Sequence, residues 1–177
     1  RVDRRQRQMC IRDRHIKVET LFDLAVSKKL KTANVLWPVM GSAGKAIKYN
    51  VPEIWSDRGV SSTKLFLKHG STNMLPTVLK FQDLLNGKKQ PNLDNFSEAV
   101  TIHTLKTKKP DLLTLHLTQL DTIRHQKGVF SADAYQVLDK VNERLGHIFD
   151  AMKKANIYDH TNIILLGDHG GNDYDHY

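Results

Sequence analysis

The sequence contains few of the residues that define specialised protein classes. Its 177 residues include one cysteine, 10 glycines and 5 prolines, which excludes a disulfide scaffold, a collagen-like repeat and a proline-rich disordered chain. No stretch approaches the roughly 20 consecutive apolar residues of a membrane-spanning helix, and the start lacks the apolar core of a secretory signal. What is present, 40% hydrophobic and 26% charged residues, is typical of one globular domain with a hydrophobic core.

The formal net charge of +8 is unevenly distributed along the chain. Residues 1–14 hold six arginines and two aspartates, and therefore half of the net charge. Their run RRQRQMCIRDR resembles a translated sequencing-library adapter, so we interpret residues 1–14 as a non-native basic leader and exclude them from fold reasoning. The alternatives are a basic arm that binds phosphate backbones and a solvated tail. Without the leader the charge is modest, and we expect no specific nucleic-acid partner.

Hydrophobic periodicity predicts helices alternating with strands in the first half. Thr20 is the expected N-cap of a short helix, and residues 32–37 read as a strand that Pro38 ends. The following residues 40–55 read as a loop with small residues and turn signals. Residues 61–90 have mixed helical periodicity, which predicts a peripheral helical excursion.

The second half reads as strand, helix, strand. Asp94 is the expected N-cap of a helix that runs to about Lys106. Residues 111–120 (DLLTLHLTQL) and 162–166 (NIILL) have the apolar pattern of strands covered on both faces. The helix that begins after Ser131 lies between them and has one apolar stripe. This order predicts an α/β fold with a mostly parallel sheet.

Two carboxylates with neighbouring histidines follow these two predicted strands. Asp121 comes directly after the first strand, with His125 four positions later, and Asp168 follows the second strand, with His169 next to it. Because parallel strands joined by a right-handed crossover end at the same edge of a sheet, we expect the two pairs to lie close together. Nitrogen and carboxylate oxygen ligands without thiolate suit a pair of divalent cations, with Zn²⁺ as the first choice.

Each of these residues also has an ordinary structural explanation. An aspartate at a strand end is often a turn former or a helix N-cap, and a single histidine is more often a surface residue than a metal ligand. The joint placement of two Asp/His pairs favours the metal site. The remaining histidines lack such a context, and we interpret them as structural or solvent-facing: His15, His69, His103, His116, His147 and His160.

The same residues carry a resemblance to a known family. The motif L-D-x-x-R-H-x-x-G from Leu120 to Gly128, the long helix after it and the G-D-H-G that begins at Gly167 resemble the type I phosphodiesterase/nucleotide pyrophosphatase branch of the alkaline phosphatase superfamily. Upstream, TLFDLA, KTANVLWPV and IKYNVPEIW extend the resemblance over about residues 17–177. It implies a three-layer α/β alkaline-phosphatase-like core with a mostly parallel sheet, incomplete at both ends, in a partial catalytic domain over residues 15–177.

The resemblance also implies an activity and a ligand set. The expected function is metal-dependent hydrolysis of small-molecule phosphate esters, above all phosphodiesters or nucleotide pyrophosphates. Asp121 and His125 would bind one zinc ion, Asp168 and His169 the other, and His176 is the candidate for a further ligand of the first ion. The family's Thr or Ser nucleophile has no counterpart here, so the covalent intermediate would form on a residue outside this chain. The fragment alone is therefore expected to be a poor catalyst.

Two other readings of function remain open at the level of sequence. One is a different activity of the same superfamily, namely a phosphomonoesterase, a phosphomutase or a sulfatase. The other is a metal-free basic module that binds nucleic acid through the arginine-rich leader. Steep salt dependence without a need for zinc would indicate the binding module.

Overall fold

The computed structural model describes residues 16–43, 46–53, 62–85 and 90–173. The basic leader over residues 1–14 and the candidate ligand His176 lie outside these residues. The interpretations of both remain predictions.

A small parallel sheet forms the centre of the structure. Its strands are β1 (Thr32–Val35), β2 (Tyr49–Val51) and β3 (Leu112–Leu115), in the spatial order β2-β1-β3. Both neighbours pair with β1 in parallel, with Val35 opposite Val51 on one side and Leu115 on the other. All four residues of β1 are buried, as expected for the central strand of a parallel sheet.

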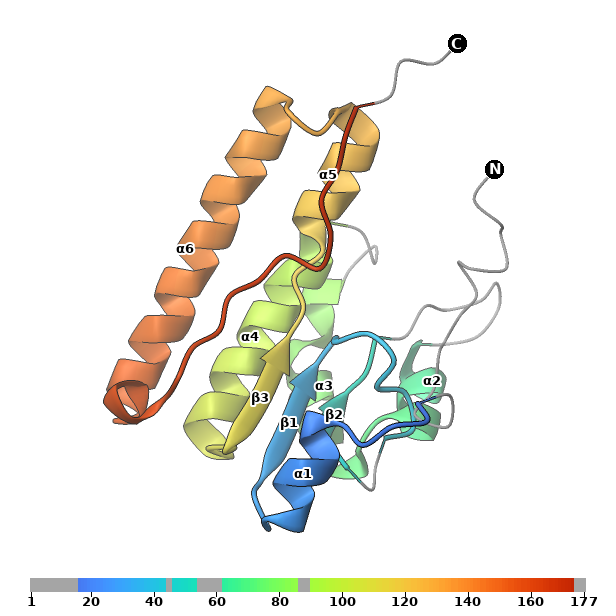
Figure 1. The fold of residues 1–177 in the computed structure, drawn as a ribbon, viewed down its shortest axis with the longest axis vertical. Coiled ribbons are helices and arrows are strands. Elements are labelled where there is room, and N and C mark those ends of the chain that lie inside the picture. Colours follow the sequence, from blue (N-terminus) through green and yellow to red (C-terminus); the bar gives the residue numbers. More distant parts are fainter. Residues whose placement is uncertain (1–15, 44–45, 54–61, 86–89, 174–177) are drawn as a thin grey trace.

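Helices cover both faces of this sheet (Figure 1). Side chains alternate between the faces of a strand, so Val35 and Leu115 point to one face and Leu112 to the other. On the first face, β1 and β2 pack against α2 (Ser62–His69), α3 (Leu75–Phe81) and α4 (Asn92–Thr107). On the other face, Leu112 packs with Phe22 of α1 (Leu21–Ser27) and with the segment after β1. The expected three-layer α/β architecture is confirmed.

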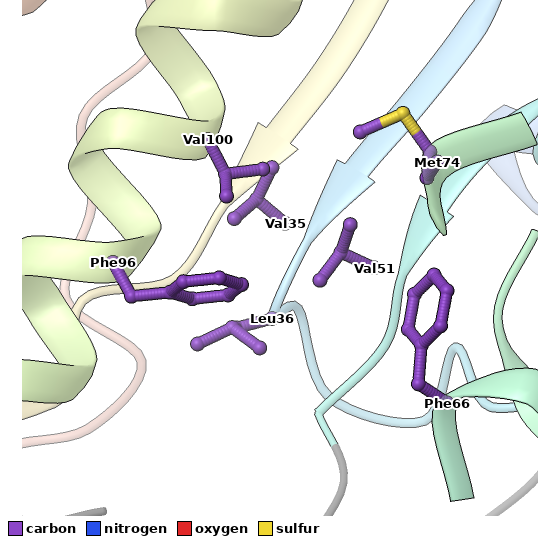
Figure 2. Close-up of a cluster of buried hydrophobic side chains, with 7 residues drawn as sticks. All are labelled: Val35, Leu36, Val51, Phe66, Met74, Phe96 and Val100. Carbon is purple, nitrogen blue, oxygen red and sulfur yellow. The ribbon is translucent and has the colours of Figure 1, made fainter. Parts of the chain in front are cut away.

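The largest hydrophobic cluster lies between the sheet and its helices (Figure 2). Its members come from β1 and the residue after it, β2, α2, the 3-10 turn η3 (Thr72–Met74) and α4: Val35, Leu36, Val51, Phe66, Met74, Phe96 and Val100. A separate cluster joins α4 to the long helix α6 (Ala132–Lys154) through Leu105, Ile148 and Met152. Leu115 of β3 packs against both clusters and so connects the sheet to α4 and α6.

Buried amides link the three strands across the second face. Asn34 of β1 donates from Nδ2 to Asn50 Oδ1 at 2.8 Å, and its own Oδ1 accepts from Thr114 Oγ1 of β3 at 3.0 Å. Asn50 completes the chain by donating to the Met40 carbonyl at 2.6 Å. Both asparagines are fully buried, and buried polar groups need such partners. These buried hydrogen bonds fix the register of β1 relative to β2 and β3.

Local capping signals correctly predicted two helix starts. Thr20 caps α1 through a reciprocal pair of hydrogen bonds with Asp23, and the Ser131 hydroxyl accepts from the backbone N–H of Ala134 at the start of α6. The predicted helical excursion is also confirmed over its described residues by α2 and α3, together with η3 and a second 3-10 turn, η4 (Gln82–Leu85).

Two local interpretations were wrong. The segment read as a loop over residues 40–55 contains β2, a strand of three residues that is too short and too polar to give a periodic signal. Asp94 does not cap α4, because that helix begins at Asn92 with Pro91 in the N-cap position. The side chain of Asp94 instead faces the start of the next helix, α5 (Gln119–Lys127).

The predicted second buried strand over residues 162–166 is also wrong. Within the described part of the chain these residues pair with no strand, and Ile164 and Leu165 are 83% and 72% exposed. An apolar run marks a segment that would be stable as a strand once both faces are covered, and no described element covers this one. Figure 1 shows the segment as an irregular trace that leads away from the turn after α6. Further along the chain, Asp173 contacts the α5–α6 connection, where the Val129 N–H donates to Asp173 Oδ1 at 2.6 Å.

Among the described residues, no helix combines the length and the apolar character that crossing a bilayer requires.

Candidate metal centre

Helix α5 carries the first Asp/His pair. It begins shortly after β3, with Asp121 in its first turn and His125 one turn further on. Residues four apart lie on the same helix face, and His125 Nε2 is 3.3 Å from Asp121 Oδ1. The sequence predicted Asp121 directly after a strand, whereas β3 ends at Leu115 and the structure places the pair on α5.

The second pair lies in a bend at Gly167–Gly170. Asp168 Oδ1 accepts the backbone N–H of His169 at 3.0 Å. His169 Nδ1 is 2.7 Å from the carbonyl oxygen of Gly170. Because a carbonyl oxygen only accepts, Nδ1 carries a proton, and in the neutral ring Nε2 keeps its lone pair.

The two pairs meet at His169. Its Nε2 lies 3.8 Å from Asp121 Oδ1 and 3.8 Å from Asp168 Oδ2. The spatial convergence expected from the strand-helix order is therefore present, although residues 162–166 form no strand. All four side chains are at least half exposed, so the cluster is open to solvent and to a ligand.

The electrostatic environment of His169 is negative. The hydrogen bond to the Gly170 carbonyl raises the pKa of His169 most, and the nearby carboxylates of Asp168 and Asp121 raise it further. Partial burial and the guanidinium of Arg124 oppose this shift of the pKa. A site with this potential attracts cations.

His116 also lies close to this cluster, although it was interpreted from the sequence as structural or solvent-facing. His116 directly follows β3, and its Nε2 lies 3.9 Å from Asp168 Oδ2. Its ring packs edge-on against Trp37, with 6.3 Å between ring centroids. The signal was available, because His116 follows the same strand as Asp121 and parallel strands deliver their ends to one edge.

The donor chemistry of the cluster fits zinc. It offers imidazole nitrogen and carboxylate oxygen, and a histidine that ligates a metal ordinarily donates its other ring N–H to a carbonyl or carboxylate, as His169 does. Within the residues that the structure describes, no three His, Cys, Asp or Glu side chains are grouped closely enough to hold a metal ion. Metal binding by Asp121, His125, Asp168 and His169 therefore stays a prediction.

Comparison with known proteins gives short but clear similarities. Venom phosphodiesterase 2 of Crotalus adamanteus is 37% identical over 65 residues, which are 37% of this chain and 8% of the venom protein. Ectonucleotide pyrophosphatase/phosphodiesterase family member 3 of Bos taurus is 35% identical over 65 residues, 37% of this chain and 7% of the relative. The matched segment thus spans less than a tenth of the length of these relatives.

The match to a family extends much further than the match to any of these relatives. No solved structure shows significant similarity to the chain. The sequence profile of the type I phosphodiesterase / nucleotide pyrophosphatase family, however, matches residues 1–177. The chain therefore belongs to the type I phosphodiesterase/nucleotide pyrophosphatase family.

Proposed function

We propose that the protein containing this chain is a metal-dependent hydrolase that cleaves phosphodiesters or nucleotide pyrophosphates. The observation that carries the proposal is the position of His169 Nε2, 3.8 Å from the carboxylates of both Asp121 and Asp168. Imidazole and carboxylate groups from distant segments gather here, at an exposed edge near the end of β3, in a chain of this family. Sheet edges of this kind are where α/β proteins bind their ligands.

The residues would divide into two ligand sets. Asp121 and His125 on α5 would hold one zinc ion, and Asp168 and His169 in the glycine bend would hold the other. His176 is a candidate for a further ligand of the first ion. Bound zinc would supply Lewis-acid stabilisation of phosphate oxygens and a reactive oxygen nucleophile at neutral pH.

The residues of this chain would orient the metal ligands for that chemistry. The Nδ1–H bond to the Gly170 carbonyl holds His169 in the tautomer that presents Nε2, and the His169 backbone N–H holds Asp168 in place. None of the hydroxyl groups in this chain is assigned as the nucleophile. A Thr or Ser elsewhere in the protein would attack phosphorus and expel the alcohol or nucleotide, and water would then release the phosphate product and restore the hydroxyl.

The relatives favour diester substrates over the other activities of the superfamily. They are described as phosphodiesterases and as an ectonucleotide pyrophosphatase/phosphodiesterase. A small-molecule phosphodiester or nucleotide is therefore the proposed substrate class, ahead of a phosphate monoester or a sulfate ester.

The test uses the intact protein with its two carboxylates altered one at a time. Asp121→Ala and Asp168→Ala should each lower zinc affinity and hydrolysis of a bis-nitrophenyl phosphodiester by at least about 100-fold, since substitutions beyond the ligands themselves already cost 10–100-fold. Asp133→Ala is the matched control, because Asp133 is an exposed aspartate in the first turn of α6. Zinc content and diester hydrolysis at the wild-type level in both carboxylate variants would exclude this site.

A further inference from the structure

Helix α5 begins without a cap of its own. Thr118 occupies the N-cap position, and its side chain makes no capping hydrogen bond. The first N–H groups of a helix have no partner within the helix, so those of α5 need an acceptor from elsewhere. Such an acceptor matters for the stability of α5, because the helix has only nine residues, none of them buried, and short helices are marginally stable without tertiary contacts.

The acceptor is a buried carboxylate from another helix. Asp94 of α4 is fully buried, and its Oδ1 accepts the backbone N–H of Thr118 at 3.0 Å while its Oδ2 accepts that of Gln119 at 3.1 Å. Gln90 Nε2 donates to the same Oδ1 at 2.9 Å and to the Thr118 hydroxyl at 2.7 Å. A buried charge is costly unless hydrogen bonds compensate it, and here the start of α5 supplies two of them.

A second contact restrains the same turn. Arg144 of α6 donates from one guanidinium nitrogen to Gln119 Oε1 at 3.3 Å and from the other to Glu98 Oε2 of α4 at 2.6 Å. The first turn of α5 is therefore held between α4 and α6. Asp121 lies two residues beyond Gln119 in this turn.

We propose that Asp94 is a positioning residue for the metal centre, which it serves by fixing the first turn of α5. The inference rests on the proposed function for its metal and on the hydrogen bonds above for its geometry. Loss of the carboxylate frees the start of α5, so that Asp121 and His125 no longer keep their place relative to Asp168 and His169. Zinc affinity then falls although no ligand has been altered.

The experiment measures two quantities in the intact protein: zinc affinity by competition with a chelating dye, and hydrogen exchange of the amides of residues 118–121. Asp94→Asn keeps the shape of the side chain but replaces one acceptor with an NH₂ group. We expect exchange of these amides to become at least about 10-fold faster, and zinc affinity to fall by about 10–100-fold, the range found when residues that orient ligands are changed. Asp133→Asn, an exposed aspartate at the start of α6, should change neither quantity by more than about twofold.

A rescue variant separates positioning from general stability. Thr118→Asp places a carboxylate at the N-cap of α5 itself, a position that favours Asp, so Asp94→Asn/Thr118→Asp should recover slow exchange and most of the zinc affinity. Unchanged zinc affinity in Asp94→Asn would overturn the proposal. If Asp94→Asn alone does not fold, a double variant that also stays unfolded would overturn the proposal as well.

Failure of the proposed function gives a different pattern. If the wild-type protein binds no zinc, the metal centre is wrong. Hydrogen exchange then still decides whether Asp94 fixes the start of α5: faster exchange confined to residues 118–121 in Asp94→Asn supports that role, and unchanged exchange refutes it.

Discussion

His169 and Asp121 face each other across two segments that are distant in the sequence, with 3.8 Å between Nε2 and Oδ1. One residue lies in a glycine-flanked bend and the other in the first turn of α5. Their approach joins the two Asp/His pairs into one cluster, which neither segment could form alone. The geometry of α5 relative to the bend therefore controls what the cluster can bind.

The two-ion assignment predicts a selective effect for His125. Because His125 is paired with Asp121 among the described residues, His125→Ala should remove one zinc ion per protein and leave the ion held by Asp168 and His169. Zinc counted by plasma mass spectrometry should fall from about two to about one equivalent, in line with two metals per site.

His147 provides the control for that measurement. It is an exposed histidine on α6, it is not one of the proposed ligands, and its Nδ1 is 2.7 Å from Glu98 Oε1. His147→Ala should retain both zinc ions. Equal zinc content in the two histidine variants would contradict the assignment of His125.

The buried amide network predicts a large stability effect at Asn34. Asn34→Ala removes the partner of Asn50 Oδ1, of Thr114 Oγ1 and of the Trp37 N–H. Each buried polar group left without a partner costs about 1–3 kcal/mol, so the free energy of unfolding should fall by about 3 kcal/mol or more in urea titrations.

Asn73 offers a comparison at the surface. Its Nδ2 donates to the Lys48 carbonyl at 3.0 Å, but the residue is exposed. Water replaces the lost hydrogen bond there, and Asn73→Ala should cost less than about 1 kcal/mol. Similar costs at the two positions would show that the network does not stabilise the sheet.

Local patterns were sufficient for much of the fold. Capping residues and an apolar stripe located α1 and α6, and a β-branched run before a proline located β1. The topology implied by strand, helix and strand also brought Asp121 and Asp168 to one place, although the second of these strands is absent. The order of elements thus predicted that the two Asp/His pairs lie close together, although Asp168 follows an irregular segment and not a strand of the sheet.

The remaining features depend on contacts between distant residues. β2 is held by pairing with β1 and by the side chain of Asn50, neither of which leaves a periodic pattern. Asp94 has the residue type and position of a local cap, but its acceptor atoms serve a helix 24 residues later. Exposure of residues 162–166 depends on which surfaces cover them, and an apolar run alone does not contain that information.

The lowered pKa of His103 predicts how the stability of the α4 region depends on pH. Burial lowers the pKa of His103 below its ordinary value, and the ammonium groups of Lys80, Lys108 and Lys106 lower it further. Its ring packs edge-on against Phe81, 5.6 Å between centroids, which accounts for the burial.

The sign of the effect follows from proton linkage. The unfolded chain takes up a proton near pH 6.5, whereas the folded chain does so only at lower pH, so stability falls as pH drops through about 6.5 toward the folded pKa. His103→Gln should reduce this slope of unfolding free energy between about pH 7 and pH 5. Lys80→Met should raise the pKa of His103, measured by NMR titration, toward its ordinary value. A His103 pKa above about 6.5 in the wild-type protein would contradict the prediction.

The ion pair between Arg144 and Glu98 should be among the costliest contacts to break. Both side chains are largely buried, at 9% and 15% exposure, and the nitrogen and oxygen lie 2.6 Å apart. Arg144→Met leaves the Glu98 carboxylate with its contact to the exposed His147 but without its buried partner, so the free energy of unfolding should fall by about 3 kcal/mol, the lower end of the usual range for breaking a buried pair. Lys140 and Glu143 form a pair of similar length, 2.8 Å, on the exposed face of α6, and Lys140→Met should cost less than about 1 kcal/mol.

The double variant Arg144→Met/Glu98→Leu removes both charges together and should recover much of the loss, since apolar replacements of a complete buried pair are often close to neutral. Urea unfolding of the four proteins distinguishes these cases. If the double variant is as unstable as Arg144→Met, the cost arises from lost packing between α4 and α6 and not from the unpaired charge.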